Sequence, residues 1–188
     1  MNQRSRILKA VGAVALALGF ASAVLLAQAP SAPAHYDSLP NFHQVNHNLY
    51  RSAQPKAPGF GILARLGVKS IVNLREDDAA AEYEASLAGA AGLKYFNVPL
   101  GRTGRPQDEQ VEKILSLVND PANQPVLVHC RLGADRTGTV IALYRITHDG
   151  WTSKRATDEA EDFGMHFWES GMKNYIRDYY KRYQAKLP

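Results

Sequence analysis

The sequence predicts an α/β fold with a central, mostly parallel sheet of about four to five strands, flanked by helices on both faces. Short apolar stretches typical of buried strands alternate with longer stretches whose apolar residues recur at helical spacing. Glycines and prolines separate these stretches at short intervals. Strands and helices in alternation favour parallel strands joined by helical crossovers, which place helices on both faces of the sheet.

The elements can be placed in order along the chain. Strands are predicted over residues 49–52, 68–74, 93–100 and 125–128. Helices are predicted over residues 59–66, 79–91, 107–118, 137–148, 153–163 and 167–186. The first two of these helices are followed by Gly67 and Gly92, which is typical of helix C-termini. The strand over residues 125–128 leads into a loop and then into the helix over 137–148.

The first 29 residues have the pattern of an export signal or an N-terminal anchor. Arg4, Arg6 and Lys9 supply a positive segment, and residues 10–27 are uncharged and apolar. This apolar run is at the short edge of the lengths that span a bilayer, so an uncleaved membrane anchor is the alternative to a cleaved signal. Both alternatives place the protein outside the cytoplasm, either exported to the periplasm or anchored and facing it. Residues 30–44 are predicted to be a linker to one folded domain over 45–188.

Charge and cysteine content narrow the function. Three of the 22 lysines and arginines lie in the first nine residues and no acid precedes Asp37, so the remainder is close to neutral despite the net charge of +4. The composition therefore does not predict a nucleic-acid partner. The chain has a single cysteine, Cys130. Cysteines in oxidising compartments usually pair, whereas an unpaired one is what a catalytic thiolate requires.

Residues 129–138 (HCRLGADRTG) predict a phosphate-binding loop between a strand and a helix. Cysteines at helix N-termini beside a cation are ionised more readily than free ones, which makes Cys130 a candidate nucleophile. Arg136 follows after five intervening residues, and its planar guanidinium fits two oxygens of a phosphoryl group. The first N–H groups of the helix add an anion site. The loop therefore combines a phosphate site with a nucleophile.

The loop resembles the Cys-x5-Arg signature of the protein tyrosine phosphatase superfamily, in its compact, dual-specificity-like bacterial form. The signature residues are His129, Cys130, Gly133, Arg136, Thr137 and Gly138. Residues 50–55 and 68–75 extend the resemblance. It implies that 45–188 is a phosphatase domain that uses no metal or other cofactor, with a phosphocysteine on Cys130 and phosphate held by Arg136. The substrate-binding residues it implies are Arg131, Leu132, Gly133, Ala134 and Thr137.

The general acid departs from the superfamily pattern. The superfamily usually takes it from an aspartate in the loop after the third strand, but residues 101–106 contain no carboxylate. Asp135 is a candidate catalytic acid because it lies inside the loop, in an arrangement similar to that of lipid-phosphatase-like and myotubularin-type enzymes. The alternative is that Asp135 only makes structural hydrogen bonds. Asp108, at the start of a predicted helix, is the second candidate, with helix capping or compensation of the helix dipole as its other interpretation.

The expected function is hydrolysis of phosphate monoesters. Phosphorylated protein carrying phosphotyrosine is the default substrate, and a phosphoinositide, an inositol phosphate or another small phosphate ester is the alternative, because Asp135 and Arg131 alter the loop. The rival classes are a pseudo-phosphatase that binds phosphate without turnover and a rhodanese-type sulfurtransferase. The sequence does not indicate an oligomeric state.

Two supporting residues carry open interpretations. Arg51 either approaches the phosphate loop or lies on the surface, which is the commoner position for an arginine. His129 is expected to orient the loop by hydrogen bonds rather than to transfer protons.

Three further histidines do not predict a metal site. His43 and His47, with His35, have no acidic or cysteine partners at metal-ligand spacing and are interpreted as ordinary polar residues.

Overall fold

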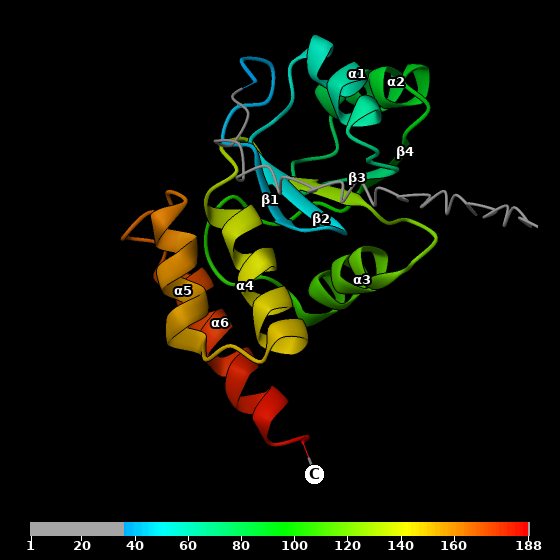
Figure 1. The fold of residues 1–188 in the computed structure, drawn as a ribbon. Helices are drawn as coiled ribbons and strands as arrows, with labels where there is room; N and C mark the ends of the chain where they lie inside the picture. The colour runs from blue at the N-terminus through cyan, green and yellow to red at the C-terminus, as the bar shows by residue number, and fades with distance from the viewer. Residues whose placement is uncertain (1–35, 188) are drawn as a thin grey trace, which may run out of the picture. The chain divides into compact units, whose positions relative to one another are not determined.

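Across residues 36–187, which the computed structural model describes, the chain forms a five-stranded sheet with helices on both faces (Figure 1). The strands are β1 (His43–Asn46), β2 (Leu49–Ser52), β3 (Ser70–Asn73), β4 (Lys94–Asn97) and β5 (Val126–His129). Their order in the sheet is β1-β2-β5-β3-β4, and every pair is parallel except β1 with β2. The predicted fold class is confirmed.

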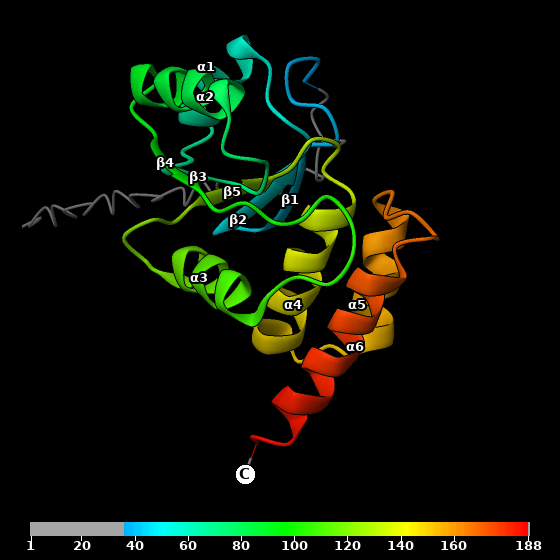
Figure 2. The ribbon, with the colours of Figure 1, turned by 180° about the vertical axis from the view of Figure 1, so that it is seen from behind.

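The helices divide between the two faces of the sheet. They are α1 (Ala57–Arg65), α2 (Ala79–Ala90), α3 (Asp108–Asn119), α4 (Asp135–Asp149), α5 (Ser153–Asp162) and α6 (Ser170–Gln184). In Figures 1 and 2, α1 and α2 lie above the sheet and the other helices below it. Alternation along β5 explains this, because Leu127 packs into the cluster with α1 and α2 while Val126 and Val128 pack into the cluster on the opposite face.

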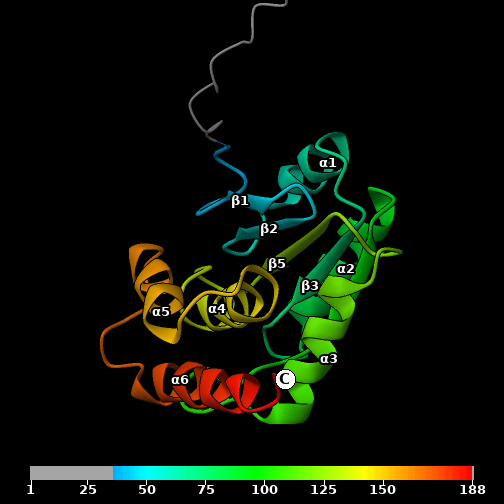
Figure 3. The ribbon, with the colours of Figure 1, turned by 60° about the horizontal axis from the view of Figure 1, so that its bottom comes forward.

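Helix α4 is buried along most of its length. It packs against both α5 and α6 (Figure 3), and its apolar residues occur all round the helix, which is typical of a core helix. Small residues bring α5 close to its first turn: a Cβ at Gly138 would lie 3.1 Å from the Cβ of Ala160. The N-terminus of α4 is therefore held firmly beneath the end of β5.

The folded unit begins earlier than predicted. Leu39 is only 2% exposed and packs with Phe60 of α1, and β1 begins at His43. The predicted linker over residues 30–44 therefore extends too far. The signal for β1 was weak because its sequence, HQVN, is polar, and it is a strand because it pairs with the edge of β2.

Two other boundaries concern the ends of the chain. The export signal or anchor predicted over residues 1–29 lies outside the described residues. Within 36–187, no helix is long and apolar enough to cross a membrane. Helix α6 begins at Ser170 rather than at residue 167, because the chain forms a loop over residues 163–169 in which Gly164 adopts a φ of +96°.

Candidate active site

The loop that holds Cys130 connects β5 to α4. Strand β5 ends at His129, which is in register with Ser52 of β2 and Asn73 of β3, so the carboxyl ends of three parallel strands meet here. Helix α4 begins at Asp135, and its N-cap residue makes no side-chain capping hydrogen bond. The first N–H groups of a helix have no partners within the helix, so those of α4 can bind an anion. The predicted placement of the loop is confirmed.

Cys130 lies at the floor of a cavity of about 210 Å³. The cysteine is 3% exposed and is not in a disulfide. The cavity is lined by Arg102, Cys130, Arg131, Leu132, Asp135 and Arg136. The structure thus brings together five residues singled out from the sequence and adds Arg102, from the loop that precedes α3. The sequence signal for Arg102 was only its position in the loop where an acid was expected.

The other three predicted binding residues shape the loop and do not line the cavity. Gly133 has a φ of +69°, and a Cβ there would lie 2.6 Å from backbone atoms of Ser52 and Ala53. Ala134 is buried, and so is Thr137, whose Oγ1 has no hydrogen-bond partner among the described residues. At position 133 glycine is therefore required, because the loop there contacts the backbone at the end of β2.

Arg51 supports the loop from β2. It is 1% exposed, it donates from NH2 to the carbonyl of Gly133 at 2.8 Å, and it lies over the ring of Phe163. Burial lowers the pKa of Arg51 to about 10, while the charge of Glu159 and, after it, Cys130 act in the opposite direction. Arg51 therefore stays charged at neutral pH. The interpretation of Arg51 as a surface residue is wrong. The sequence feature that indicated its burial was its position within a strand whose other residues are mostly buried.

Arg136 points into the cavity beside a carboxylate that the sequence interpretation had not placed there. Its NH1 donates to the carbonyl of Leu74 at 3.3 Å and lies 3.6 Å from Oε2 of Glu76. The other Glu76 oxygen accepts from Nε of Arg102 at 2.7 Å. A backbone hydrogen bond and the two arginines lower the pKa of Glu76, against the opposing effect of partial burial. Glu76 is therefore ionised at neutral pH and holds both cations at the cavity.

A buried acid–base pair lies beneath the loop. Nε2 of His129 is 2.7 Å from Oε1 of Glu84 on α2, and both side chains are almost inaccessible to solvent. The second Glu84 oxygen accepts from Gln54 at 3.3 Å, and Nδ1 of His129 lies 3.4 Å from the carbonyl oxygen of Cys130. A carbonyl oxygen only accepts hydrogen bonds, so Nδ1 is the donor. His129 thus orients the loop, and Glu84 was missed because nothing local marks it as buried.

Asp135 lines the cavity but its carboxylate faces residues 163–169. The backbone N–H of His166 donates to Oδ1 at 2.8 Å. Nδ1 of the same histidine lies 3.0 Å from Oδ1 and 2.9 Å from Oδ2. Sequence reasoning gave His166 no role, because 31 residues separate the two side chains.

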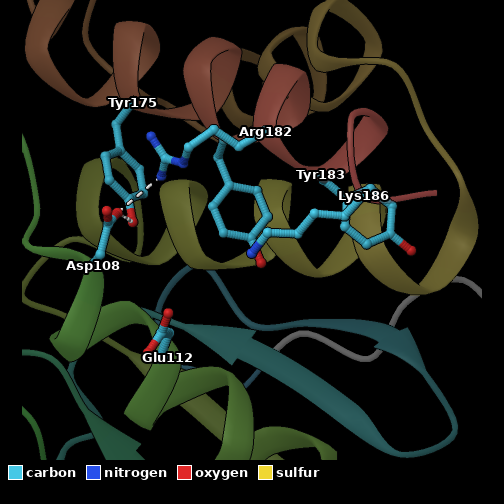
Figure 4. Close-up of a pocket in the computed structure, with 7 residues that line it drawn as sticks. Asp108, Glu112, Tyr175, Arg182, Tyr183 and Lys186 are labelled. Atoms are coloured by element: carbon cyan, nitrogen blue, oxygen red, sulfur yellow. Dashed lines mark hydrogen bonds and ion pairs between the residues drawn. The ribbon is translucent and has the colours of Figure 1, made fainter.

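Asp108 lies in a different cavity, of about 270 Å³, between α3 and α6 (Figure 4). One of its oxygens accepts from the Tyr175 hydroxyl at 2.6 Å and from NH2 of Arg182 at 2.9 Å. Burial and the charge of Asp108 raise the pKa of Tyr175 well above its usual value. Asp108 is not the N-cap residue of α3, which is Gln107, but it lies in the first turn of that helix, where a negative charge compensates the helix dipole. The structure therefore assigns Asp108 to the contact between two helices.

The described part of the chain offers no metal site: no group of three or more histidine, cysteine, aspartate or glutamate side chains within 36–187 could hold an ion. His43 instead packs edge-on against Phe163 at a centroid distance of 4.5 Å. Burial lowers the pKa of His43, with a further contribution from Arg51. His35 lies outside the described residues.

A family model described as DSP-PTPase phosphatase fused to NAD+ kinase matches residues 34–178, which include the whole loop and every strand. The chain belongs to this family. The predicted membership in the protein tyrosine phosphatase superfamily, in its dual-specificity-like branch, is therefore confirmed.

Individual phosphatases of the same kind are similar over most of the chain. The dual specificity protein phosphatase TpbA of Pseudomonas aeruginosa (strain UCBPP-PA14) is 32% identical over 141 residues, which cover 73% of this chain and 62% of TpbA. The chain thus spans about three fifths of the length of that curated relative.

Solved structures share the fold. The core catalytic domain of the PP-IP phosphatase SIW14 from Saccharomyces cerevisiae, in complex with citrate, matches with a TM-score of 0.67 at 29% identity, over 79% of this chain and 93% of that one. A TpbA variant of P. aeruginosa in complex with phosphotyrosine matches with a TM-score of 0.65 at 28% identity, over 85% of this chain and 99% of that one. The family assignment from the sequence therefore agrees with the fold similarity to solved phosphatase structures.

Proposed function

We propose that this DSP-PTPase family member hydrolyses phosphate monoesters through a phosphocysteine on Cys130. The observation that carries the proposal is the position of Cys130 in a cavity shared with Arg136, at the uncapped start of α4. That position offers a nucleophile, a bidentate cation and oriented N–H groups to one phosphoryl group.

The reaction has two steps. The Cys130 thiolate attacks phosphorus, so that an S–P bond forms and the ester P–O bond breaks, while a proton passes to the leaving oxygen. Arg136 and the loop N–H groups hold the phosphoryl oxygens, where negative charge is stabilised most effectively. Water then attacks phosphorus, inorganic phosphate leaves, and the thiolate is restored. The Thr137 hydroxyl, buried without a partner among the described residues, is available to stabilise that thiolate.

Phosphotyrosine protein is the substrate that we place first, and the TpbA structure in complex with phosphotyrosine supports it. A second candidate is a small molecule that carries several phosphates. Arg102 and Arg131 favour it, because they line the cavity beyond Arg136 and can bind a second phosphate. The relative SIW14 is described as a PP-IP phosphatase, which agrees with this candidate.

Phosphate release from a phosphotyrosine peptide and from an inositol polyphosphate tests the proposal. Cys130→Ser should abolish release while phosphate binding persists, and Arg136→Lys should lower turnover by about 10²–10³-fold because a bidentate contact is lost. Release that survives Cys130→Ser would contradict the mechanism. Wild-type protein that binds phosphate without turnover would favour the pseudo-phosphatase, and sulfur transfer from thiosulfate to cyanide would favour the sulfurtransferase.

The same assay separates the two substrates. Arg102→Ala and Arg131→Ala should raise KM for the inositol polyphosphate more than for the phosphotyrosine peptide, because only the former presents a second phosphate to them. An equal effect on both substrates would argue against the polyphosphorylated small molecule.

We also propose that residues 1–29 direct the protein out of the cytoplasm, as a cleaved signal or as a membrane anchor. The support is the positive segment followed by an uncharged apolar run. Cell fractionation and N-terminal sequencing of the full chain test this. A protein found in the cytoplasmic fraction with its N-terminus intact would contradict it.

A further inference from the structure

The loop over residues 163–169 is attached to several parts of the active site. Its first residue, Phe163, packs beneath the buried Arg51, whose guanidinium carbon lies 4.1 Å from the ring centroid. Its last residue, Glu169, is buried and accepts from the backbone N–H of Gly104 at 3.4 Å. Gly104 belongs to the loop in which the superfamily usually carries its acid. The loop over residues 163–169 is therefore held at its first residue by Arg51 and at its last residue by Gly104.

His166 lies on this loop, and its ring contacts Asp135, which lines the active-site cavity. Asp135 accepts the backbone N–H of His166 on Oδ1, and Nδ1 lies within 3.0 Å of both carboxylate oxygens. One N–H shared between two acceptor oxygens explains that geometry, and it assigns the Nδ1 proton to the ring. The ring is about one third exposed and lies tilted against the Trp168 ring, with the two centroids 4.4 Å apart. Nε2 is then the atom from which the pair can release a proton.

The other described candidates for the acid are unsuited to the role. Glu76 has a lowered pKa and stays ionised. Asp108 binds Tyr175 in a separate cavity. Asp135 itself acts as an acceptor toward His166 through both oxygens, so it is not placed to donate a proton to a substrate.

We propose that His166 is the general acid of this phosphatase and that Asp135 holds it in place; the inference rests on the function proposed above. In the first step the Nε2 proton of the imidazolium passes to the ester oxygen as the P–O bond breaks and the S–P bond to Cys130 forms. In the second step the neutral Nε2 takes a proton from the attacking water as the S–P bond breaks. A carboxylate that fixes Nδ1 and stabilises the imidazolium is a proven arrangement in acid–base catalysis.

The pH dependence of kcat depends on the charged and titratable groups around the loop. Those that contact residues 163–169 from other elements are Asp135, Arg51, His43 and Lys173, and the loop itself carries Glu169. Of these, Asp135 contacts the His166 ring directly. Because the first step consumes the protonated ring, kcat should fall on the basic side of the pH profile.

The test is His166→Asn, which keeps an amide donor facing Asp135 but has no proton to transfer. With phenyl phosphate, whose leaving oxygen needs a proton, kcat should fall by about 10²-fold or more. With p-nitrophenyl phosphate, whose leaving group departs as a stable anion, the loss should be only a few-fold. The basic limb of the kcat profile should disappear in the variant. His166→Gln, tested alongside, keeps the experiment informative if one variant fails to fold.

A matched control is available in His148→Asn. His148 forms a second histidine–aspartate pair, with Nδ1 2.7 Å from Asp149, at the opposite end of α4 from Cys130. This variant should retain wild-type kcat on both substrates. Equal losses on both substrates with an unchanged pH profile would show that His166 is only structural and would overturn the inference, as would wild-type kinetics of His166→Asn. A wild-type protein that releases no phosphate would overturn the proposed function itself.

Discussion

Glu84 and Arg51 are charged side chains that are almost completely buried, and both support the loop that holds Cys130. Burial of a charge is costly unless a partner or several hydrogen bonds compensate it. Arg51 is compensated in part, by the Gly133 carbonyl and the Phe163 ring, while its Nε and NH1 have no hydrogen-bond partner among the described residues. Glu84 is compensated by His129 and Gln54. These residues therefore hold the loop in one conformation through interactions that a surface side chain does not offer.

Glu84→Ala should destabilise the fold strongly. It leaves His129 buried without its partner, which typically costs about 3–5 kcal/mol. The measurement is the free energy of unfolding in urea, with Glu82→Ala as the matched control, because Glu82 lies on the same helix and is exposed. If both variants lose the same stability, the buried pair does not contribute as described.

At the scale of elements, the junction between β2 and the loop after β5 depends on one glycine. The backbone of Ser52 and Ala53 leaves no space for a Cβ at position 133, and the positive φ there disfavours other residues. This contact, together with the hydrogen bond from Arg51, fixes the loop to the neighbouring strand.

Gly133→Ala should therefore lower both stability and phosphate binding. The left-handed conformation alone costs an alanine about 1–2 kcal/mol, and the contact with β2 backbone adds to that by moving the loop. Thermal unfolding and titration with inorganic phosphate measure the two effects. Gly89→Ala is the control, since Gly89 lies within α2, a Cβ there meets no atom within 4 Å, and alanine should stabilise by about 0.5–1 kcal/mol. Normal phosphate affinity in Gly133→Ala would contradict this account.

At the scale of the whole molecule, the domain includes residues that the sequence assigned to a linker. Leu39 packs beneath α1, where Gly59 leaves room for its side chain, and β1 covers the edge of the sheet. The family match, which begins at residue 34, agrees with this extent.

Truncation tests that boundary. A chain that begins at residue 45 should be less stable than one that begins at 34 by at least the burial of Leu39, about 1.5–3 kcal/mol, and it also loses the first two residues of β1. Chemical denaturation of the two chains provides the comparison. Equal midpoints and slopes would show that residues 34–44 do not contribute to the fold.

Much of the fold follows from local pattern. The apolar run into β5, the helical spacing in α3 and the glycines after α1 and α2 act over a few residues, and the predicted boundaries of these elements lie within a few positions of the observed ones. Strand β1 was missed because its polar sequence becomes a strand only by pairing with β2. That Cys130 and Arg136 line one cavity was predictable because their spacing in one loop encodes their geometry.

The sequence by itself determined the α/β class, the position of the loop between β5 and α4, and Cys130 and Arg136 within it, because all of these depend on residues close together in the chain. Only the tertiary structure decided which side chains surround that loop. Glu76 and Arg102 at the cavity, Glu84 beneath His129 and His166 beside Asp135 come from other elements. Side chains distant in sequence meet through strand order and helix packing, and no local pattern records such a contact.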